Sequence, residues 1–245
     1  MERQIIVQEG KKILALEKDI LRRVDELRQS GVGSLVLGGA PSYQRYYLSR
    51  VISLFQSQYP YVQITLRESY SNLLCDDLLK GTVDIALISD PIPPGIEAVP
   101  VFDEEIFLAL PPDHPLVEQL PKEGTPYPVA DLAICRDESF ITYRPGRRIT
   151  DVLIRETKRS GFTPKILTES ASTESANAMI QQGFGVGLVP SVTVELCPAC
   201  RHARYYRLRP EGLMRQFWLA RRAGAYTSQA QRAFFEVASR LDQKK

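Results

Sequence analysis

The chain has 245 residues, of which 44% are hydrophobic, 24% charged and 9% aromatic, and its formal net charge is +2 at pH 7. This composition is that of an ordinary globular protein, so it excludes the disordered, collagen-like and fibrous classes. Four cysteines are too few for a small disulfide scaffold. No stretch reaches the ~20 apolar residues that cross a membrane, and the charged N-terminus lacks the apolar run of a signal peptide. We therefore expect a soluble cytoplasmic protein.

The first segment has the pattern of a long amphipathic helix. Ile6, Ile13, Ile20 and Leu27 recur every seven residues, and a glycine hinge ends the helix, which we place at residues 1–32. A helix of this length on a short hinge has little of its own domain to pack against. We therefore expect these four side chains to pair two subunits, with packing on the chain's own body as the alternative.

Strands and helices alternate from residue 33 onward. The apolar patterns predict a strand at 34–38, a helix at 43–58, a strand at 62–67, a helix at 72–80 and a strand at 83–88. This order predicts a parallel sheet with helices on its faces. A proline-rich crossing at 90–95 and two strands, at 98–102 and 105–110, follow.

The same unit is then repeated. We predict a strand at 139–143, a helix at 150–160, a strand at 165–168, a helix at 173–182, a strand at 185–189, a strand at 216–221 and a helix at 228–241. The last helix is expected to return to the first lobe. The predicted lobes are 33–90 with 222–245, and 91–221. This α/β organisation predicts a bilobed binding protein whose ligand lies in the cleft at the carboxyl ends of the strands.

The basic end of the chain has a simpler explanation than nucleic-acid binding. Residues 201–245 hold 11 Lys and Arg against 3 Asp and Glu. Such a surplus can bind nucleic acid. From Arg204 to Arg209, however, the arginines are interleaved with apolar residues, as on the exposed face of a strand. We favour that interpretation.

Several motifs occur in an order and spacing that identify a family. They are Gly-Ser-Leu-Val-Leu-Gly at 33–38, Tyr-Pro at 59–60, Val-Asp-Ile-Ala-Leu-Ile at 83–88, His-Pro-Leu at 114–116, Gly-Phe-Gly-Val-Gly-Leu-Val-Pro at 183–190 and Phe-Trp-Leu-Ala at 217–220. Together they resemble the effector domain of LysR-type transcriptional regulators over nearly the whole chain. The resemblance implies the type 2 periplasmic-binding-protein fold, with two Rossmann-like lobes.

The resemblance also implies a role for the first helix. Residues 1–30 look like the family's linker helix, which follows a winged helix-turn-helix and pairs two subunits. Because Met1 lies close to this linker, we expect the DNA-binding domain to be absent from this chain, so that DNA is contacted only through that missing domain. The expected partners are a small-molecule effector and further copies of the chain, in a dimer or tetramer.

Candidate ligand-binding residues follow the predicted strands. Gly38 and Gly39 are expected to leave the backbone uncovered, and Ser42 places a hydroxyl beside the free N–H groups of a helix start, which attract anions. In the family this loop often carries a Ser or Thr that contacts the effector. Ser42 could also cap the helix, and the two roles are compatible.

Three further loops carry candidates. We expect Ser71 to cap a helix, and Asn72 falls where the family tends to place a polar ligand contact. Tyr143 and Arg144 follow a strand of the second lobe, where an arginine can hold a carboxylate in a bidentate fork. Thr173 opens another helix. Capping and turn chemistry is the alternative for each, and the expected effector is a carboxylate or other small anion.

Enzymatic chemistry finds little support in the sequence. The chain has two histidines, and His114 lies in a turn that the family shares. The phosphate-binding and metalloprotease motifs GxGxxG, Walker A and HExxH are missing. The acidic clusters 76–77 and 103–105 are interpreted as surface charge. We therefore expect no catalytic residue, no cofactor and no enzyme.

Cys197 and Cys200, with His202, form the one metal-like motif. Two cysteines separated by two residues occur in zinc sites and in thiol redox sites. A structural zinc site needs four ligands, and the nearest others in the sequence, Cys135 and His114, lie in different elements. A redox pair usually opens a helix after a strand. We therefore expect ordinary thiols and no metal, with a regulatory disulfide or a zinc site as the alternatives; Cys75 is expected in the core.

The sequence thus predicts a ligand-sensing regulatory module. Closure of the lobes around the effector would change how paired subunits present their DNA-binding domains. The effector can shift the balance between the open and closed states only because its affinity for them differs. The alternative is a solute-binding protein of a transporter with the same bilobed fold. The missing export signal and the linker helix disfavour that alternative.

Overall fold

The computed structural model describes two compact units of the chain. Their bounds are Met1–Phe102 with Gln216–Lys245, and Asp103–Arg215. The described residues are 10, 13, 16, 17, 19, 20, 23, 24, 33–123, 127–196, 202–209 and 211–242. Within them, we find no helix with the length and apolar character needed to cross a bilayer.

The units are joined by two continuous strands, β4 (Ile96–Leu110) and β9 (Met214–Arg222). Each unit boundary falls inside one of these strands, whereas the sequence placed the lobe boundaries in the loops near residues 90 and 222. The sequence also predicted two strands where β4 is one. β4 continues through the gap predicted between 102 and 105, where Glu104 and Glu105 form ion pairs with Arg215 and Arg207.

The sheet of the first unit is mixed rather than parallel throughout. β1 (Ser34–Gly39) pairs in parallel with β2 (Gln63–Glu68) and with β3 (Ile85–Ser89), as predicted. β9 joins the other edge of β3 in the antiparallel direction, giving the order β2-β1-β3-β9. The direction of β9 differs because it is the strand by which the chain returns from the second unit.

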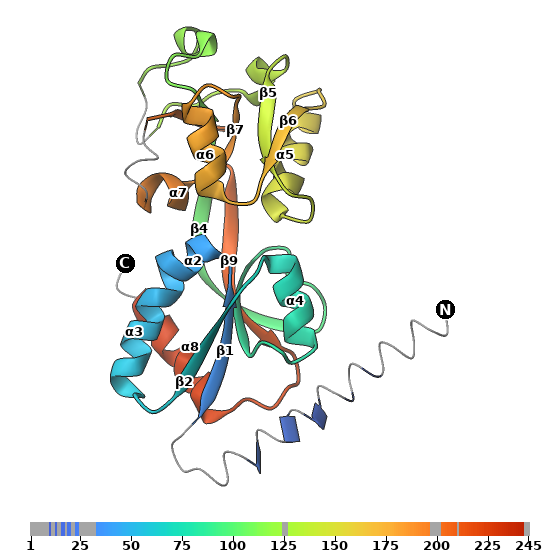
Figure 1. Cartoon of the computed structure of the whole chain (residues 1–245), viewed down its shortest axis with the longest axis vertical. Coiled ribbons are helices and arrows are strands. Elements are labelled where there is room, and N and C mark those ends of the chain that lie inside the picture. The colour runs from blue at the N-terminus through green and yellow to red at the C-terminus, as the bar shows by residue number, and fades with distance from the viewer. Residues whose placement is uncertain are drawn as a thin grey trace. The chain divides into compact units, whose positions relative to one another are not determined.

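Helices cover both faces of this sheet. One helical stretch runs from α2 (Pro41–Tyr43) through a π-helical turn at Gln44–Leu48 into α3 (Ser49–Gln58). Figure 1 shows α3 and α8 (Gln229–Asp242) on one side of β1 and α4 (Ser71–Leu79) on the other. The rings of Phe55 and Phe234 join α3 to α8 at 5.3 Å. The predicted return of the last helix to the first unit is confirmed.

The second unit repeats the alternation of strands and helices. β5 (Ser139–Tyr143) and β6 (Lys165–Ser170) are parallel, and Phe140 bridges in parallel to Val186, just before β7. The remaining elements are α5 (Arg148–Arg159), α6 (Thr173–Gln181), β7 (Gly187–Pro190), α7 (Ser191–Leu196), β8 (Arg204–Arg207), and 3-10 turns at Pro115–Gln119 and Leu132–Cys135. β7 and β8 both pair antiparallel with the end of β4. The predicted repetition is confirmed.

Acidic residues that the sequence suggested were surface charge are instead buried in ion pairs. Glu104 is 2% exposed, and its carboxylate lies 2.5 Å from Nε of Arg215. Asp77 is 7% exposed and lies 2.7 Å from Nε of Arg67. The surface prediction was therefore wrong for these residues. Their partners lie in other elements, 10 positions away for Asp77 and 111 positions away for Glu104, and neighbours in the sequence do not reveal them.

The described residues of the first segment are helical and contact the first unit through polar side chains. Asp19 lies 2.6 Å from Arg222, and the guanidinium of Arg23 lies 4.5 Å from the ring centre of Tyr226. The apolar side chains remain exposed, by 69% at Ile13, 59% at Leu16, 53% at Ile20 and 36% at Val24. Ile6 and Leu27 of the predicted seam lie outside the described residues.

Candidate functional site

The candidate residues of the first unit lie at the edge where its parallel strands end. β1 ends at Gly39 and β2 at Glu68, and the helices that carry Ser42 and Ser71 begin within three residues of those ends. Parallel strands place their carboxyl ends at one edge of the sheet, so the topology brings these helix starts together. Ser42 is half-buried and Asn72 is exposed.

The two glycines that end β1 serve packing and do not leave the backbone uncovered. Gly38 and Gly39 are both buried, contrary to the expectation of an uncovered backbone. A Cβ atom on Gly38 would lie 2.5 Å from Cδ2 of Leu74, and one on Gly39 would lie 2.9 Å from Cδ1 of Leu48. Because such distances are too short for carbon atoms, a Cβ at either position would force the leucine side chain to shift, whereas glycine lets the helices approach the strand end without that shift.

Gln44, which sequence reasoning missed, fixes the ends of two strands. Its amide Nε2 donates to the carbonyl oxygens of Gly39, at 2.9 Å, and Arg67, at 3.1 Å. Gln44 is 9% exposed and opens the π-helical turn. Such turns are frequent at functional sites. A glutamine near the start of the helix predicted at 43–58 was the available signal.

Ser71 does not cap its helix, so that prediction was wrong. The N-cap residue of α4 is Tyr70, which makes no side-chain cap bond, and Ser71 is the first helical residue. Its hydroxyl instead accepts a hydrogen bond from the backbone N–H of Ser89 at 3.1 Å. Ser71 thereby ties the end of β3 to the start of α4.

Tyr143 fixes the corresponding edge of the second unit. Its side chain is 1% exposed, and its hydroxyl donates to the carbonyl oxygen of Leu188 at 2.9 Å. Burial raises the pKa of this hydroxyl far above its usual range, so it remains a donor at neutral pH. The guanidinium of Arg147 lies 4.8 Å from the ring centre. The hydroxyl of Tyr143 is thus engaged in holding β5 to β7.

Arg144 and Thr173 differ in exposure. Arg144 directly follows β5 and its side chain is exposed. Thr173 is 3% exposed, and its hydroxyl donates to the carboxylate of Glu174 at 3.1 Å. The cap of α6 is Ser172, whose hydroxyl accepts from the N–H of Ser175 at 3.0 Å.

Arg147 is anchored to a neighbouring loop of the second unit. Its guanidinium donates to the carbonyl oxygen of Ala171 at 2.9 Å. This bond joins the loop after β5 to the loop after β6. The loops that carry Arg144 and Thr173 are therefore connected within the second unit.

His114, Cys75 and Cys135 lie in surroundings that indicate structural roles. Nδ1 of His114 accepts from the N–H of Leu116, and Nε2 lies 3.4 Å from Glu138. Cys75 and Cys135 are buried free thiols. Cys197 and Cys200 lie outside the described residues. Within the described part of the chain, no group of three potential ligands could hold a metal ion.

The edges thus present hydroxyl, amide and guanidinium groups beside helix starts, an arrangement suited to binding an anion. The family of the chain is shown by a match to a known family model. The model of the LysR substrate binding domain matches residues 28–242. This chain belongs to that family. The resemblance stated from the sequence is confirmed, and with it the type 2 periplasmic-binding-protein fold.

The curated relatives of this LysR domain are regulators. The chain is 26% identical over 174 residues to the transcriptional dual regulator GltC of Bacillus subtilis, covering 70% of this chain and 55% of that protein. It is 24% identical over 233 residues to a probable RuBisCO transcriptional regulator of Cyanidioschyzon merolae, covering 93% of this chain and 75% of that protein. The chain therefore spans about half to three quarters of these relatives. They are transcriptional regulators and not enzymes, in agreement with the prediction.

Solved structures of the same fold include ligand complexes. The regulatory domain of Synechocystis PCC6803 CcmR with 2-PG has a TM-score of 0.75 at 18% identity, covering 86% of this chain and 98% of that one. The effector binding domain of QuiR with shikimate has a TM-score of 0.72 at 19% identity, covering 87% and 98%. At these identities the likeness establishes the fold.

Proposed function

We propose that this LysR domain senses a small anionic metabolite and transmits its binding to paired DNA-binding domains of a cytoplasmic transcriptional regulator. The observation that carries the proposal is the family match over 28–242, combined with hydroxyl, amide and guanidinium groups at the strand ends of each unit. The proposal keeps the cleft site expected from the sequence. The contacts that support it are those described within each unit separately.

The six candidate residues divide into two proposed roles. Ser42, Asn72 and Arg144 are half-buried or exposed and are proposed to contact the effector. Ser71, Tyr143 and Thr173 have hydroxyls bonded to protein atoms and are proposed to fix the loops that present those contacts. Gln44 and Arg147 join the second group through their backbone bonds.

These groups support an anionic effector. Arginine binds a carboxylate or phosphate through two parallel N–H bonds, and a helix start adds partial positive charge. The relatives whose structures hold 2-PG, shikimate or benzoate have bound acids, which accords with this class. We propose the same class here, without assigning a particular compound.

Substitutions in each unit test the proposal once a ligand is found. Arg144→Gln and Ser42→Ala should each weaken its binding by about 10-fold to 100-fold, because a charge-assisted hydrogen bond is worth roughly 1.5–3 kcal/mol. Isothermal titration calorimetry gives the dissociation constants. The matched control is Arg136→Gln, which removes the same charge from another exposed site in the second unit. Equal affinities for wild type and both site variants would refute the assignment.

A further inference from the structure

The described residues of the first segment meet the first unit at the end of β9. We call residues 221–227, which comprise the last residues of β9 and the turn after it, the β9 corner. Among the described residues of the first segment, only Asp19 is buried, with 7% of its surface exposed. A carboxylate is seldom buried without a partner, because removing its charge from water is costly. The burial of Asp19 therefore indicates a specific contact.

Two contacts hold the segment to the β9 corner. Oδ2 of Asp19 lies 2.6 Å from Nη2 of Arg222, and the guanidinium of Arg23 lies 4.5 Å from the ring centre of Tyr226. Asp19, Arg222 and Tyr226 also line a cavity of about 10 Å³, which has room for at most one water molecule. The ion pair is thus largely shielded from the water that weakens exposed pairs.

The polar contacts and the exposed apolar side chains lie on different faces of the helical segment. Asp19 and Arg23 are four positions apart, so their side chains lie one above the other on a helix. Ile20 and Val24 each follow one of them by one position, which is a rotation of about 100° around the helix axis. Both are exposed. Docking through the polar face therefore turns the apolar face away from the first unit, where a second copy of the chain can reach it.

The β9 corner is also tied to β4, the other strand that joins the two units. Nη2 of Arg221 lies 2.5 Å from the carboxylate of Glu97, near the start of β4, and Arg221 also donates to the hydroxyl of Thr227. The Glu97 carboxylate accepts from the N–H of Gly224 at 3.3 Å. Gly224 has a φ of +66°, which glycine adopts without strain in a turn. One end of each connecting strand therefore meets the first segment at this corner.

We propose that the β9 corner is a docking surface that orients the first segment on its own first unit and passes movement of β4 and β9 to it. Arg222 and Tyr226 are the positioning residues. The partner that fits them is a helix with an acidic residue and an arginine four positions apart, as at Asp19 and Arg23. This inference deepens the proposed function and rests on it, because paired DNA-binding domains would be presented through this segment.

Zero-length cross-linking of the whole chain tests the docking. In Arg222→Lys a positive charge remains at position 222, so the ion pair with Asp19 is kept. A carbodiimide activates the Asp19 carboxyl, and the introduced amine attacks it to form an amide while the reagent leaves as a urea. Mass spectrometry should find this link between positions 19 and 222. The control Arg240→Lys, at an exposed position of α8, should give no link to the first segment.

A mixture of unlabelled and ¹⁵N-labelled Arg222→Lys chains shows which copy is docked. The cross-linked peptides should carry both halves from the same isotope, because the segment docks on its own unit. Peptides of mixed isotope would show docking on a second copy.

Hydrogen exchange of peptides that cover residues 10–24 tests whether the ion pair orders the segment. Asp19→Asn and Arg222→Gln should each speed exchange about 5-fold, because a shielded charged pair is lost. The double variant should be no faster than either single one, since both remove the same contact. Arg240→Gln is the matched control and should leave these rates unchanged. Peptides from β1 show whether a variant has loosened the first unit as a whole.

Glu97→Gln tests the connection to the strands. Glu97 contacts no described residue of the first segment, yet its loss should speed exchange there about 2-fold to 5-fold by loosening the β9 corner. Glu105→Gln is the control on the same strand, because the partner of Glu105 is Arg207 of β8.

Three results would overturn the inference. The first is the absence of the 19–222 link, or its presence only between copies. The second is that the effects of Asp19→Asn and Arg222→Gln multiply in the double variant, which would show that the two residues act separately. The third is unchanged exchange in Glu97→Gln. All of these measurements are made without an effector, so failure of this inference is distinguishable from failure of the proposed function.

Discussion

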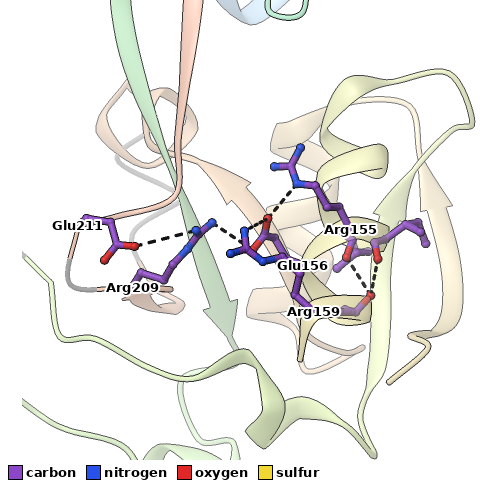
Figure 2. A network of polar contacts seen from close by, with 8 residues as sticks. Arg155, Glu156, Arg159, Arg209 and Glu211 are labelled. Carbon is purple, nitrogen blue, oxygen red and sulfur yellow. Dashed lines mark hydrogen bonds and ion pairs between the residues drawn. The ribbon is translucent and has the colours of Figure 1, made fainter. Parts of the chain in front are cut away.

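At the scale of single residues, buried carboxylates held by arginines are a recurring feature of the chain. Glu156 of α5 is 7% exposed, and Figure 2 shows it facing Arg155, Arg159 and Arg209. Its oxygens lie 3.0, 3.7 and 3.1 Å from these guanidinium groups, respectively. Because Arg209 follows β8, the network attaches α5 to a segment distant in the sequence. Removing the partners of such a carboxylate would leave an unpaired buried charge, which strongly destabilises the folded state.

Glu156→Gln should therefore lower the free energy of unfolding by about 1–3 kcal/mol, since bonds to a charged group are replaced by weaker ones. Urea denaturation measures the change. The control is Glu236→Gln, whose pair with Arg240 spans 3.9 Å between exposed side chains and should contribute less than about 0.5 kcal/mol. Equal losses for the two variants would show that burial does not strengthen the Glu156 network.

The buried thiol of Cys135 should make the stability of the protein fall as pH rises in the alkaline range. Burial, and then the charge of Glu138, raises the pKa of its thiol from 9.0 to about 12. Between these values the unfolded chain has released the proton and the folded chain has kept it. Stability is therefore full below pH 9 and falls as pH rises toward 12, by up to about 1.4 kcal/mol per pH unit from this group.

The contribution of Cys135 is isolated by its variant. Cys135→Ala should show a shallower fall in unfolding free energy from pH 9 to 11 than wild type, whatever the loss of packing does to its absolute stability. Urea titrations at several pH values give the two slopes. Identical slopes would show that this thiol does not ionise on unfolding in that range.

At the scale of elements, regular periodicity was enough to predict most of the fold. The strand predicted at 139–143 is β5, and the predicted helix at 173–182 is α6 to within one residue. The π-helical turn at Gln44–Leu48 was not predictable from periodicity, and its first residue, Gln44, bonds to backbone oxygens in two strands. The antiparallel direction of β9 depends on the path of the chain, and the role of Ser71 depends on Ser89, 18 residues away. Local patterns carry no such information.

The same reasoning applies to the candidate site. Strand ends and helix starts, which follow from periodicity and turn residues, pointed to Ser42 and Arg144, and the family resemblance pointed to Asn72. The positioning contacts of Gln44 and Arg147 join loops that are distant in sequence, so only the structure revealed them.

The first segment has an exposed apolar face. Ile13 and Ile20 are exposed while Asp19 contacts the first unit, so the apolar face remains available for a second copy of the chain. The double variant Ile13→Asp/Ile20→Asp should dissociate an oligomer to monomers, because each buried isoleucine contributes about 1.5–3 kcal/mol and a buried aspartate opposes association further.

Light scattering measures the mass of both proteins. The control is Glu17→Ala, a substitution at an exposed helical residue of the same segment, which should leave the mass unchanged. A monomeric wild type, or an unchanged oligomer in the double variant, would contradict pairing through these isoleucines.

At the scale of the whole molecule, the account rests on one capacity, the binding of a small anion by a LysR substrate-binding domain. The family match fixes the fold, and the strand-end groups of both units supply the proposed contacts. Binding to the native state alone must stabilise that state, by about 2.7 kcal/mol when the ligand is at a hundred times its dissociation constant.

Thermal denaturation of the wild-type chain against a panel of small carboxylates, phosphates and neutral metabolites is the most direct test. For a chain of this size, a true effector at a hundred times its dissociation constant should raise the melting temperature by roughly 5 to 10 °C. At least one anion should do so, and Arg144→Gln should abolish most of the shift. A panel in which only neutral compounds stabilise the protein, or in which the shift survives Arg144→Gln and Ser42→Ala together, would contradict the proposed binding of an anion.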